Sequence, residues 1–491
     1  MPAEPPDPYA IIAAQQETIA KLTDTVEKLR GEIADLKHLL FGQKSERRRE
    51  GKMPSIERSL REREGNDPAR EVERRLATKK KRAKSAAKKK ELPTVDVVHD
   101  VEQCPECEGG DLEDLKSPEE SYEIELVPAH LVRIRHVRQK KKCRSCRKII
   151  TAPAPVRVTE GCQWGPRLHA HAVTAKCGDA IPFYRLAKRF QRDGMPVERS
   201  TLNRVFHRSA ELLRPVANRI LELVSQQERV NADETPIRVQ APEKCRRGYV
   251  WTFLSGKLIG YVFSPSRSGE TPSRILGGTN GTLQVDNYTG YNAVTTPDAR
   301  ERVGCIGHVR RKFFRALESA PDEADTALAH ILSLYEVEYE AARRGILGTS
   351  KHLALRRSLT KERLDAFGDW MREKQPHHLP ESPMGKALRY GLATLPSLTA
   401  VLRDAKVRLD NNLAENALRI IALGRKNFLF VGDDVAGENL AVLQTVVATC
   451  IANDVNSEEY IADVLLRLDD TRSSDIDSLL PMNWQPREDS S

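Results

Sequence analysis

Aromatic side chains, cysteines and long apolar runs are all scarce in this chain of 491 residues. We find no run of about 18 or more apolar residues, so the sequence predicts no membrane-spanning helix. The opening MPAEPPDPYA lacks the basic and apolar stretches of a secretory signal peptide. Nine cysteines are too few for a disulfide scaffold, which favours a reducing cytosol. An aromatic content of 5% argues against a zinc-dependent RNA-binding protein that stacks bases on aromatic platforms.

Positive charge, in contrast, is abundant and concentrated in two stretches. Residues 74–90 hold ten lysines and arginines, residues 133–148 hold nine, and neither stretch contains an acid. Since the net charge of the whole chain is only +9, the remainder is net acidic. Such clustering is typical of a surface that binds a polyanion, here nucleic acid. The alternative is a solubilising tail followed by a charged ribbon.

The N-terminal segment carries a heptad repeat over residues 11–41. Apolar residues recur every seven positions, with a second set three positions later: Ile12, Ile19, Val26, Ile33 and Leu40, then Gln15, Leu22, Leu29 and Leu36. Branched residues at the first position and leucine at the second favour a parallel two-stranded coiled coil. The alternative is an amphipathic helix that docks on its own domain.

The patterns along the chain predict a multidomain α/β protein. We expect a leucine-zipper-like coiled coil (1–45), a basic linker (46–92), a zinc-binding ribbon (93–157) and a helical DNA-binding region (158–228). A core of alternating strands and helices follows in two pieces, 229–310 and 401–450, separated by an all-helical insertion, 311–400. Residues 451–491 form a C-terminal region, of which the last twenty residues are polar and expected to fray.

Two Cys-x-x-Cys pairs, Cys104 with Cys107 and Cys143 with Cys146, predict a tetrahedral Zn²⁺ site. A β-hairpin of residues 122–127 and 131–137 would fill the interval, as in a zinc ribbon. The alternative is a set of redox or unrelated cysteines. The other cysteines lack such spacing and are interpreted as small apolar residues: Cys162, Cys177, Cys245, Cys305 and Cys450.

A helix-turn-helix pattern occupies residues 183–211. The first helix spans 184–192 and ends at Asp193-Gly194, and the second opens at Glu198 and runs to about Leu213. Its exposed face would present Arg199, Thr201, Asn203, Arg204 and Arg208 to a DNA major groove. The alternative is a plain helical hairpin.

Three acids carry the chemical signal. Asp233 and Asp286 each end an apolar strand, and Glu415 lies in the first turns of a helix. Carboxylates that converge from such elements can hold two Mg²⁺ or Mn²⁺ ions, which activate a water or a 3′-hydroxyl and stabilise the leaving oxygen of a phosphodiester. Each acid could instead be a helix cap or a surface group.

Cations near these acids are candidates for DNA contacts. The set comprises His308, Arg310, Arg311 and Lys312 at a helix start, together with Arg419, Arg425 and Lys426. Arg267 is expected either to hold DNA or to brace a loop. We interpret Glu234 and Asp410 as supporting neighbours of the acids or as caps.

Several motifs together make the chain resemble the insertion sequence 66 family of bacterial transposases, which belongs to the Asp–Asp–Glu group. They are CPEC with CRSC, ADETPIRV, SPSRSGETPSRIL, LQVDNYTGYNAV, GHVRRKFF and LDNNLAENALR followed by GRKNFLFVG. The resemblance implies an RNase H-like catalytic core with a helical insertion, and it places the catalytic acids at Asp233, Asp286 and Glu415.

The function expected from this resemblance is DNA transposition. Hydrolysis at the element ends would expose a 3′-hydroxyl, which would then attack target DNA. The coiled coil would pair protomers, and accessory proteins of the same element would take part in a cytoplasmic, nucleoid-associated complex. Two alternatives stay open: a transposase-derived DNA-binding regulator without catalysis, and an RNase H-fold nuclease.

Overall fold

The computed structural model describes residues 131–142, 144, 149–195 and 197–487. By its packing the chain divides into two units, residues 64–135 and the remainder, and only 131–135 of the smaller unit are described. The coiled coil, the basic linker and the cysteines of the ribbon, Cys104, Cys107, Cys143 and Cys146, lie outside the described residues.

A short hairpin precedes the main body of the chain. Strands β1 (Lys140–Lys142) and β2 (Ile149–Thr151) pair antiparallel, so they bracket the second cysteine pair. The segment 131–137, which we expected to be a strand, is not one: it pairs with no described strand, and Val132 and Ile134 are 68% and 70% exposed. The other strand of the expected hairpin, 122–127, lies outside the described residues.

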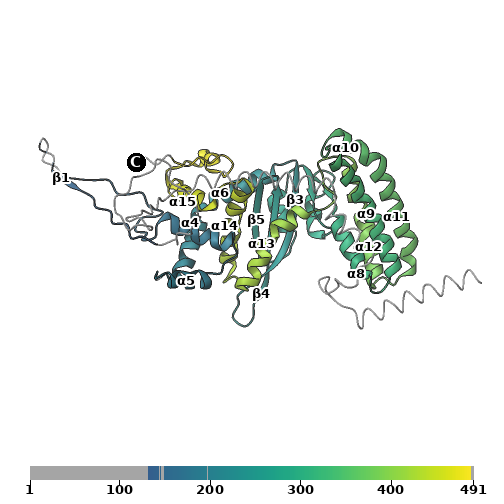
Figure 1. The fold of residues 1–491 in the computed structure, drawn as a ribbon, viewed down its shortest axis with the longest axis horizontal. Helices are drawn as coiled ribbons and strands as arrows, with labels where there is room; N and C mark the ends of the chain where they lie inside the picture. Colours follow the sequence, from purple (N-terminus) through teal and green to yellow (C-terminus); the bar gives the residue numbers. More distant parts are fainter. Residues whose placement is uncertain (1–130, 143, 145–148, 196, 488–491) are drawn as a thin grey trace, which may run out of the picture. The chain divides into compact units, whose positions relative to one another are not determined.

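A five-stranded mixed sheet forms the centre of the structure (Figure 1). Its strands are β3 (Arg229–Val239), β4 (Arg246–Ser255), β5 (Leu258–Ser264), β6 (Gly281–Gln284) and β7 (Arg300–Val303), in the spatial order β5-β4-β3-β6-β7. Strands β3, β4 and β5 are antiparallel neighbours, whereas β6 is parallel to both β3 and β7. The five β-rich segments of the sequence therefore form one sheet.

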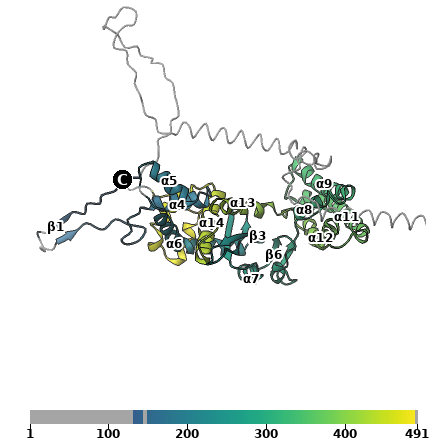
Figure 2. The ribbon, with the colours of Figure 1, turned by 90° about the horizontal axis from the view of Figure 1, so that it is seen from below.

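Helices cover both faces of the sheet, because residues along each strand point alternately to opposite sides. Ile237 and Val239 of β3 pack on one face with α13 (Asn412–Phe428) and α14 (Asp434–Ala452). Val230 and Ala232 pack on the other face with α7 (Glu270–Leu276) and the 3₁₀ turn η2 (Thr289–Val294). Figure 2 shows α13 and α7 on opposite sides of β3.

Helix α14 corrects the expectation that no segment is apolar enough to cross a membrane. With 19 residues and a mean hydropathy of 1.5, it is long and apolar enough to cross a membrane, by length and composition only. It packs between β5 and α6 (Arg199–Ser225), and Leu443, Val446 and Val447 are fully buried. A helix that is apolar on every side is also what the core of a large domain requires.

Three helices form the region that precedes the sheet: α4 (Pro166–Cys177), α5 (Phe183–Arg192) and α6. Helix α6 continues well beyond the expected end near Leu213, because Val216, Ile220 and Val224 extend its buried face into the core. Thr201, which we expected on the exposed face, is buried.

A second core lies within a helical segment of its own. It contains α8 (Ile306–Ala316), α9 (Pro321–Arg343), α10 (Ser350–Leu355), a π-helical turn η3 (Arg356–Thr360), α11 (Lys361–Lys374) and α12 (Pro383–Leu398), with short 3₁₀ turns η4 (Gln375–His377) and η5 (Thr399–Leu402). The segment begins five residues before position 311. The Ile306 amide donates to the carbonyl of Leu409 at 2.9 Å, which ties its first helix to the start of α13.

The C-terminal region is more ordered than its polar composition suggested. Helix α15 (Ser457–Val464) is followed by the 3₁₀ turns η6 (Leu468–Asp470) and η7 (Ser473–Leu479). Leu479 and Leu480 are buried, and the Trp484 indole donates to Asp463 at 2.7 Å. The expectation that the last twenty residues fray is therefore wrong up to about residue 485, because a few apolar residues anchor the segment.

Candidate active site

Asp233 lies in the middle of β3, whereas we had expected it at the end of a strand. Strand β4 pairs with β3 along its length, from Asn231 to Val239, so the strand continues past the acid. On its other edge β3 pairs with β6 only from Arg229 to Asn231. This edge of β3 is therefore free of strand pairing at Asp233. Because side chains alternate along a strand, the Asp233 side chain lies on the same face as Ile237 and Val239, which is the face that meets α13.

The structure brings Asp286 and Glu415 to the same place. Asp286 follows β6 by two residues, and Glu415 lies in the first turn of α13. Burial raises the pKa of Asp233 to about 8, and the negative charges of Glu234, Asp286 and Glu415 add to the rise, while a hydrogen bond from the Glu234 amide opposes it. The structure therefore places Asp286 and Glu415 close enough for their charges to act on Asp233.

Three side-chain amides join the elements that carry these acids. Asn231 donates to Asn411 at 2.9 Å and to Gln284 at 3.1 Å. Asn411, fully buried before α13, donates to the carbonyl of Ala232 at 2.7 Å. Gln284 donates to the carbonyl of Arg408 at 2.6 Å. The network fixes the start of α13 against β3 and β6. The sequence did not predict it, because only burial in the folded protein distinguishes these side-chain amides from those on the surface.

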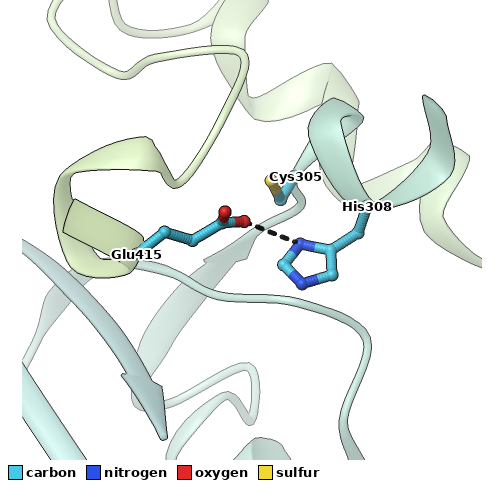
Figure 3. Close-up of side chains that lie close together, drawn as sticks. All are labelled: Cys305, His308 and Glu415. Atoms are coloured by element: carbon cyan, nitrogen blue, oxygen red, sulfur yellow. Dashed lines mark ion pairs between the residues drawn. The ribbon is translucent and has the colours of Figure 1, made fainter. Parts of the chain in front are cut away.

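Glu415 is held by residues of α8. The Arg311 guanidinium donates to both carboxylate oxygens at 3.0 Å, and the Nδ1 atom of His308 lies 3.7 Å from Oε1 (Figure 3). Burial and the charge of Arg311 lower the pKa of His308. Both residues were selected as DNA contacts, yet in the structure they face a carboxylate of the acid cluster. The hydrogen bonds of Arg311 limit the positions that the Glu415 carboxylate can take.

Glu234 points to the opposite face of β3, where its side chain is only 2% exposed. It accepts hydrogen bonds from the Tyr291 hydroxyl at 2.7 Å and from Arg267 at 2.8 Å. Arg267 lies 4.0 Å from the ring centroid of Tyr288, whose backbone amide donates to Asp286 at 2.9 Å. Arg267 thus braces the loop that carries Asp286, which is one of the two roles we had left open.

The other selected residues divide by environment. Arg425 donates to Thr235 at 3.1 Å and to the carbonyl of Pro236, so it is attached to β3. Arg208 pairs with Glu211 at 2.8 Å. Asp410 accepts from Tyr335 and from the Asn412 amide, which is a cap-like arrangement. Half-buried Arg310 and Lys312 lie beside aromatic rings, whereas the remaining side chains are exposed: Arg199, Asn203, Arg204, Arg419 and Lys426.

The acid cluster has the chemistry of a site for a hard divalent cation. Its donors are carboxylate oxygens, the ligands that Mg²⁺ and Mn²⁺ prefer. Asp233 is half-buried beside other negative charges, which is unfavourable unless a proton or a cation neutralises it. Asp233, Asp286 and Glu415 therefore fit such an ion.

This arrangement predicts that Asp233→Asn stabilises the protein at alkaline pH in the absence of Mg²⁺. Because the pKa of Asp233 is raised from 3.8 to about 8, its contribution to folding is complete below pH 4 and is lost as the pH rises through 8. We expect the variant to match the wild type at pH 4 and to exceed it by about 2–4 kcal/mol at pH 8.5.

Urea denaturation of both proteins in Mg²⁺-free buffer across this pH range measures the effect. Asp298→Asn, at an exposed aspartate, serves as the control with the same change of charge. A variant with the same excess stability at pH 4 and pH 8.5 would contradict the pKa assignment.

Comparisons with known proteins identify the family of this chain. Residues 161–439 match the family described as "Transposase IS66 family", residues 102–147 match the "zinc-finger binding domain of transposase IS66", and residues 445–482 match the "IS66 C-terminal element". Two uncharacterized proteins of Sinorhizobium fredii are similar. One, y4hP, is 30% identical over 416 residues, covering 79% of this chain and 74% of the relative. The other, y4jD, is 30% identical over 419 residues, covering 81% of each. The chain belongs to the Transposase IS66 family.

Proposed function

We propose that this protein cleaves DNA at the ends of an insertion sequence and joins the resulting 3′-hydroxyl to target DNA. The observation that carries the proposal is the convergence of Asp233, Asp286 and Glu415 on one electrostatically coupled site. The strand order, three antiparallel strands followed by two parallel ones, supports an RNase H-like core. Membership of a transposase family supplies the substrate class, DNA.

The three acids would hold Mg²⁺ or Mn²⁺, with Asp233 and Asp286 shared between two ions and Glu415 completing one of them. Ions in such a site activate an attacking oxygen and stabilise the leaving oxygen of a phosphodiester. The chain's own contribution is to fix the acids. Asn411 and Asn231 hold the start of α13 beside β3, and Arg311 orients the Glu415 carboxylate. Such pre-organisation is the main requirement when the reaction depends on position and charge.

Several basic groups would bind the DNA backbone around this site. Arg419 and Lys426 are exposed on α13, the helix that carries Glu415, while Arg310 and Lys312 lie on α8 with Arg311 and His308. Arginine and lysine neutralise phosphates without reading sequence, so they would set the position of the strand.

Recognition of the element ends would rest on other parts of the chain. The α5–α6 pair resembles a helix-turn-helix in its first half, and Arg199, Asn203 and Arg204 are exposed on α6. The zinc-finger match covers both cysteine pairs, so Cys104, Cys107, Cys143 and Cys146 would hold a structural Zn²⁺. The hairpin β1–β2 flanks the second pair with lysines that could meet phosphates.

Assembly is the remaining part of the proposal. The heptad repeat of residues 11–41 would pair two protomers as a coiled coil, so that two element ends meet in one complex. We also propose a cytoplasmic, nucleoid-associated location and cooperation with other proteins of the same element.

An assay with labelled DNA that carries one element end tests the proposal. With Mg²⁺, the full chain should nick the end at a defined position and then join it to a second DNA, which yields a longer labelled product. A protein that binds the end but never nicks it would be a regulator. One that nicks without joining, at any target concentration, would be a nuclease.

A further inference from the structure

Besides the three acids, the site contains a second set of ligand atoms. Cys305 caps the start of α8, His308 lies one turn into that helix, and Glu415 faces both from α13 (Figure 3). One ligand atom from each, the Cys305 Sγ, a ring nitrogen of His308 and a Glu415 oxygen, lies within 4.8 Å of the other two. We propose that this trio binds a soft or borderline divalent cation, Zn²⁺, and that this binding inhibits the proposed DNA cleavage.

The state of His308 is the independent evidence for a ligand. Its Nδ1 atom is buried and makes no hydrogen bond with any described residue, although it faces the Glu415 carboxylate at 3.7 Å. A buried imidazole nitrogen without a partner is costly, and a metal ion is one of the groups that can satisfy it.

The chemistry of the three donors selects the metal. A thiol, an imidazole and one carboxylate are the donor types that Zn²⁺ accepts, and three protein ligands leave a fourth position for water. Mg²⁺ requires oxygen ligands and would not use the sulfur or the nitrogen. The same corner of the molecule therefore offers a hard site to Mg²⁺ and a mixed site to Zn²⁺, and Glu415 belongs to both.

Two local features, the protonated thiol of Cys305 and the positive charge of Arg311, lower the affinity of the trio for Zn²⁺ without preventing its binding. Burial raises the pKa of the Cys305 thiol to about 12, so the thiol must lose its proton to solvent as the sulfur–metal bond forms. The backbone N–H of Asn411 already donates to Cys305 Sγ at 3.2 Å, which would stabilise the resulting thiolate. Arg311 contributes a nearby positive charge, but it contacts the Glu415 oxygens at hydrogen-bond distance and can remain there as an outer partner.

Inhibition follows from the shared carboxylate, and this part of the inference rests on the proposed function. When Zn²⁺ engages Glu415 together with Cys305 and His308, the carboxylate is withdrawn from Asp233 and Asp286. The acid cluster then lacks its third ligand. Cys305 takes no part in the proposed cleavage, so replacing it separates the two uses of the site.

Cobalt spectroscopy tests the metal site without requiring any DNA chemistry. Co²⁺ replaces Zn²⁺ in the full-length protein, and the spectrum of the wild type is compared with those of Cys305→Ser and of Cys450→Ser, a control at another buried cysteine. We expect the wild type and the control to share a sulfur-to-cobalt band that Cys305→Ser lacks, beyond the signal of the four-cysteine ribbon. Identical spectra for the wild type and Cys305→Ser would overturn the site.

Metal analysis of the wild type gives a second test that does not depend on the folding of the Cys305→Ser variant. After incubation with excess Zn²⁺ and desalting, we expect about two zinc ions per chain, one in the ribbon and one here. A value of one or less would overturn the site.

The inhibition test uses the same proteins with Mg²⁺ and labelled end DNA. At free Zn²⁺ about ten times the dissociation constant, wild-type cleavage should fall about tenfold, and Cys305→Ser should lose little activity. Equal inhibition of both proteins would overturn the inhibitory role. If the wild type never cleaves DNA, the proposed function fails, while the cobalt spectrum still decides the metal site.

Discussion

Replacing Asp286 by asparagine should abolish DNA cleavage and strand transfer while leaving the binding of element ends intact. The substitution keeps the shape of the side chain and its ability to accept the hydrogen bond from the Tyr288 amide, so the loop should keep its conformation. It removes the negative charge that a divalent cation requires. Since ions in such a site supply most of the stabilisation of a phosphoryl-transfer transition state, we expect a loss of about a thousandfold or more.

The measurement is the rate of nicking of labelled end DNA with Mg²⁺, together with a mobility shift for binding in the absence of divalent ions. Asp298→Asn is the matched control, because it makes the same change at an exposed aspartate further along the same loop. A folded Asp286→Asn protein that still nicks the end would refute the role of Asp286 as a metal ligand, and so would one that loses end binding.

Replacing Arg356 by alanine should have the largest effect on stability among single substitutions in the helical segment. Arg356 is 1% exposed and forms two hydrogen bonds with Glu338, at 2.8 and 2.7 Å. It also donates to the carbonyls of Val401 and Asp404, at 3.3 and 3.1 Å, beyond the end of α12. Truncation would leave the half-buried Glu338 carboxylate with only His352, 3.3 Å away, and several carbonyls without this donor. Removing one partner of a buried ion pair typically costs about 3–5 kcal/mol.

Denaturation by urea, followed by circular dichroism, provides the comparison. The neighbouring Arg357 is exposed and donates only to the carbonyl of Leu402 among the hydrogen bonds described, so Arg357→Ala should cost less than about 1 kcal/mol. Equal losses of stability in the two variants would contradict the prediction, because they would mean that burial of the Arg356–Glu338 pair does not determine the cost of losing the arginine. Because α8 belongs to the same core, Arg356→Ala should also weaken the hold of Arg311 on Glu415.

Periodicity and composition predicted which helices and strands exist, but they predicted the first and last residues of these elements less well. The β-rich segments became the strands of one sheet, since alternating apolar residues require two covered faces. Helix α6 and the start of α8 were placed less well, because their ends depend on contacts with distant residues such as Leu409.

Residue type selected the acids, but it could not assign roles to the residues around them. Arg311 and His308 look like DNA-binding residues in the sequence, and only the tertiary fold brings their side chains to Glu415. Cys305 read as an ordinary apolar residue, whereas its sulfur faces His308 and Glu415. The amides of Asn231, Gln284 and Asn411 gave no signal at all, because a hydrogen bond between distant residues leaves no local pattern.

The sequence by itself determined the family, the candidate acids and the cysteine pairs, because these depend on residue identity and order, which chemistry constrains directly. The tertiary structure decided which groups meet. Asp233 and Glu415 are far apart in the chain and become neighbours because α13 packs on the face of β3 that carries Asp233, at a point where β6 no longer pairs with β3. Their mutual repulsion, the hold of Arg311 and the proximity of Cys305 and His308 arise from that packing, since electrostatic and metal-binding interactions depend on distance in space.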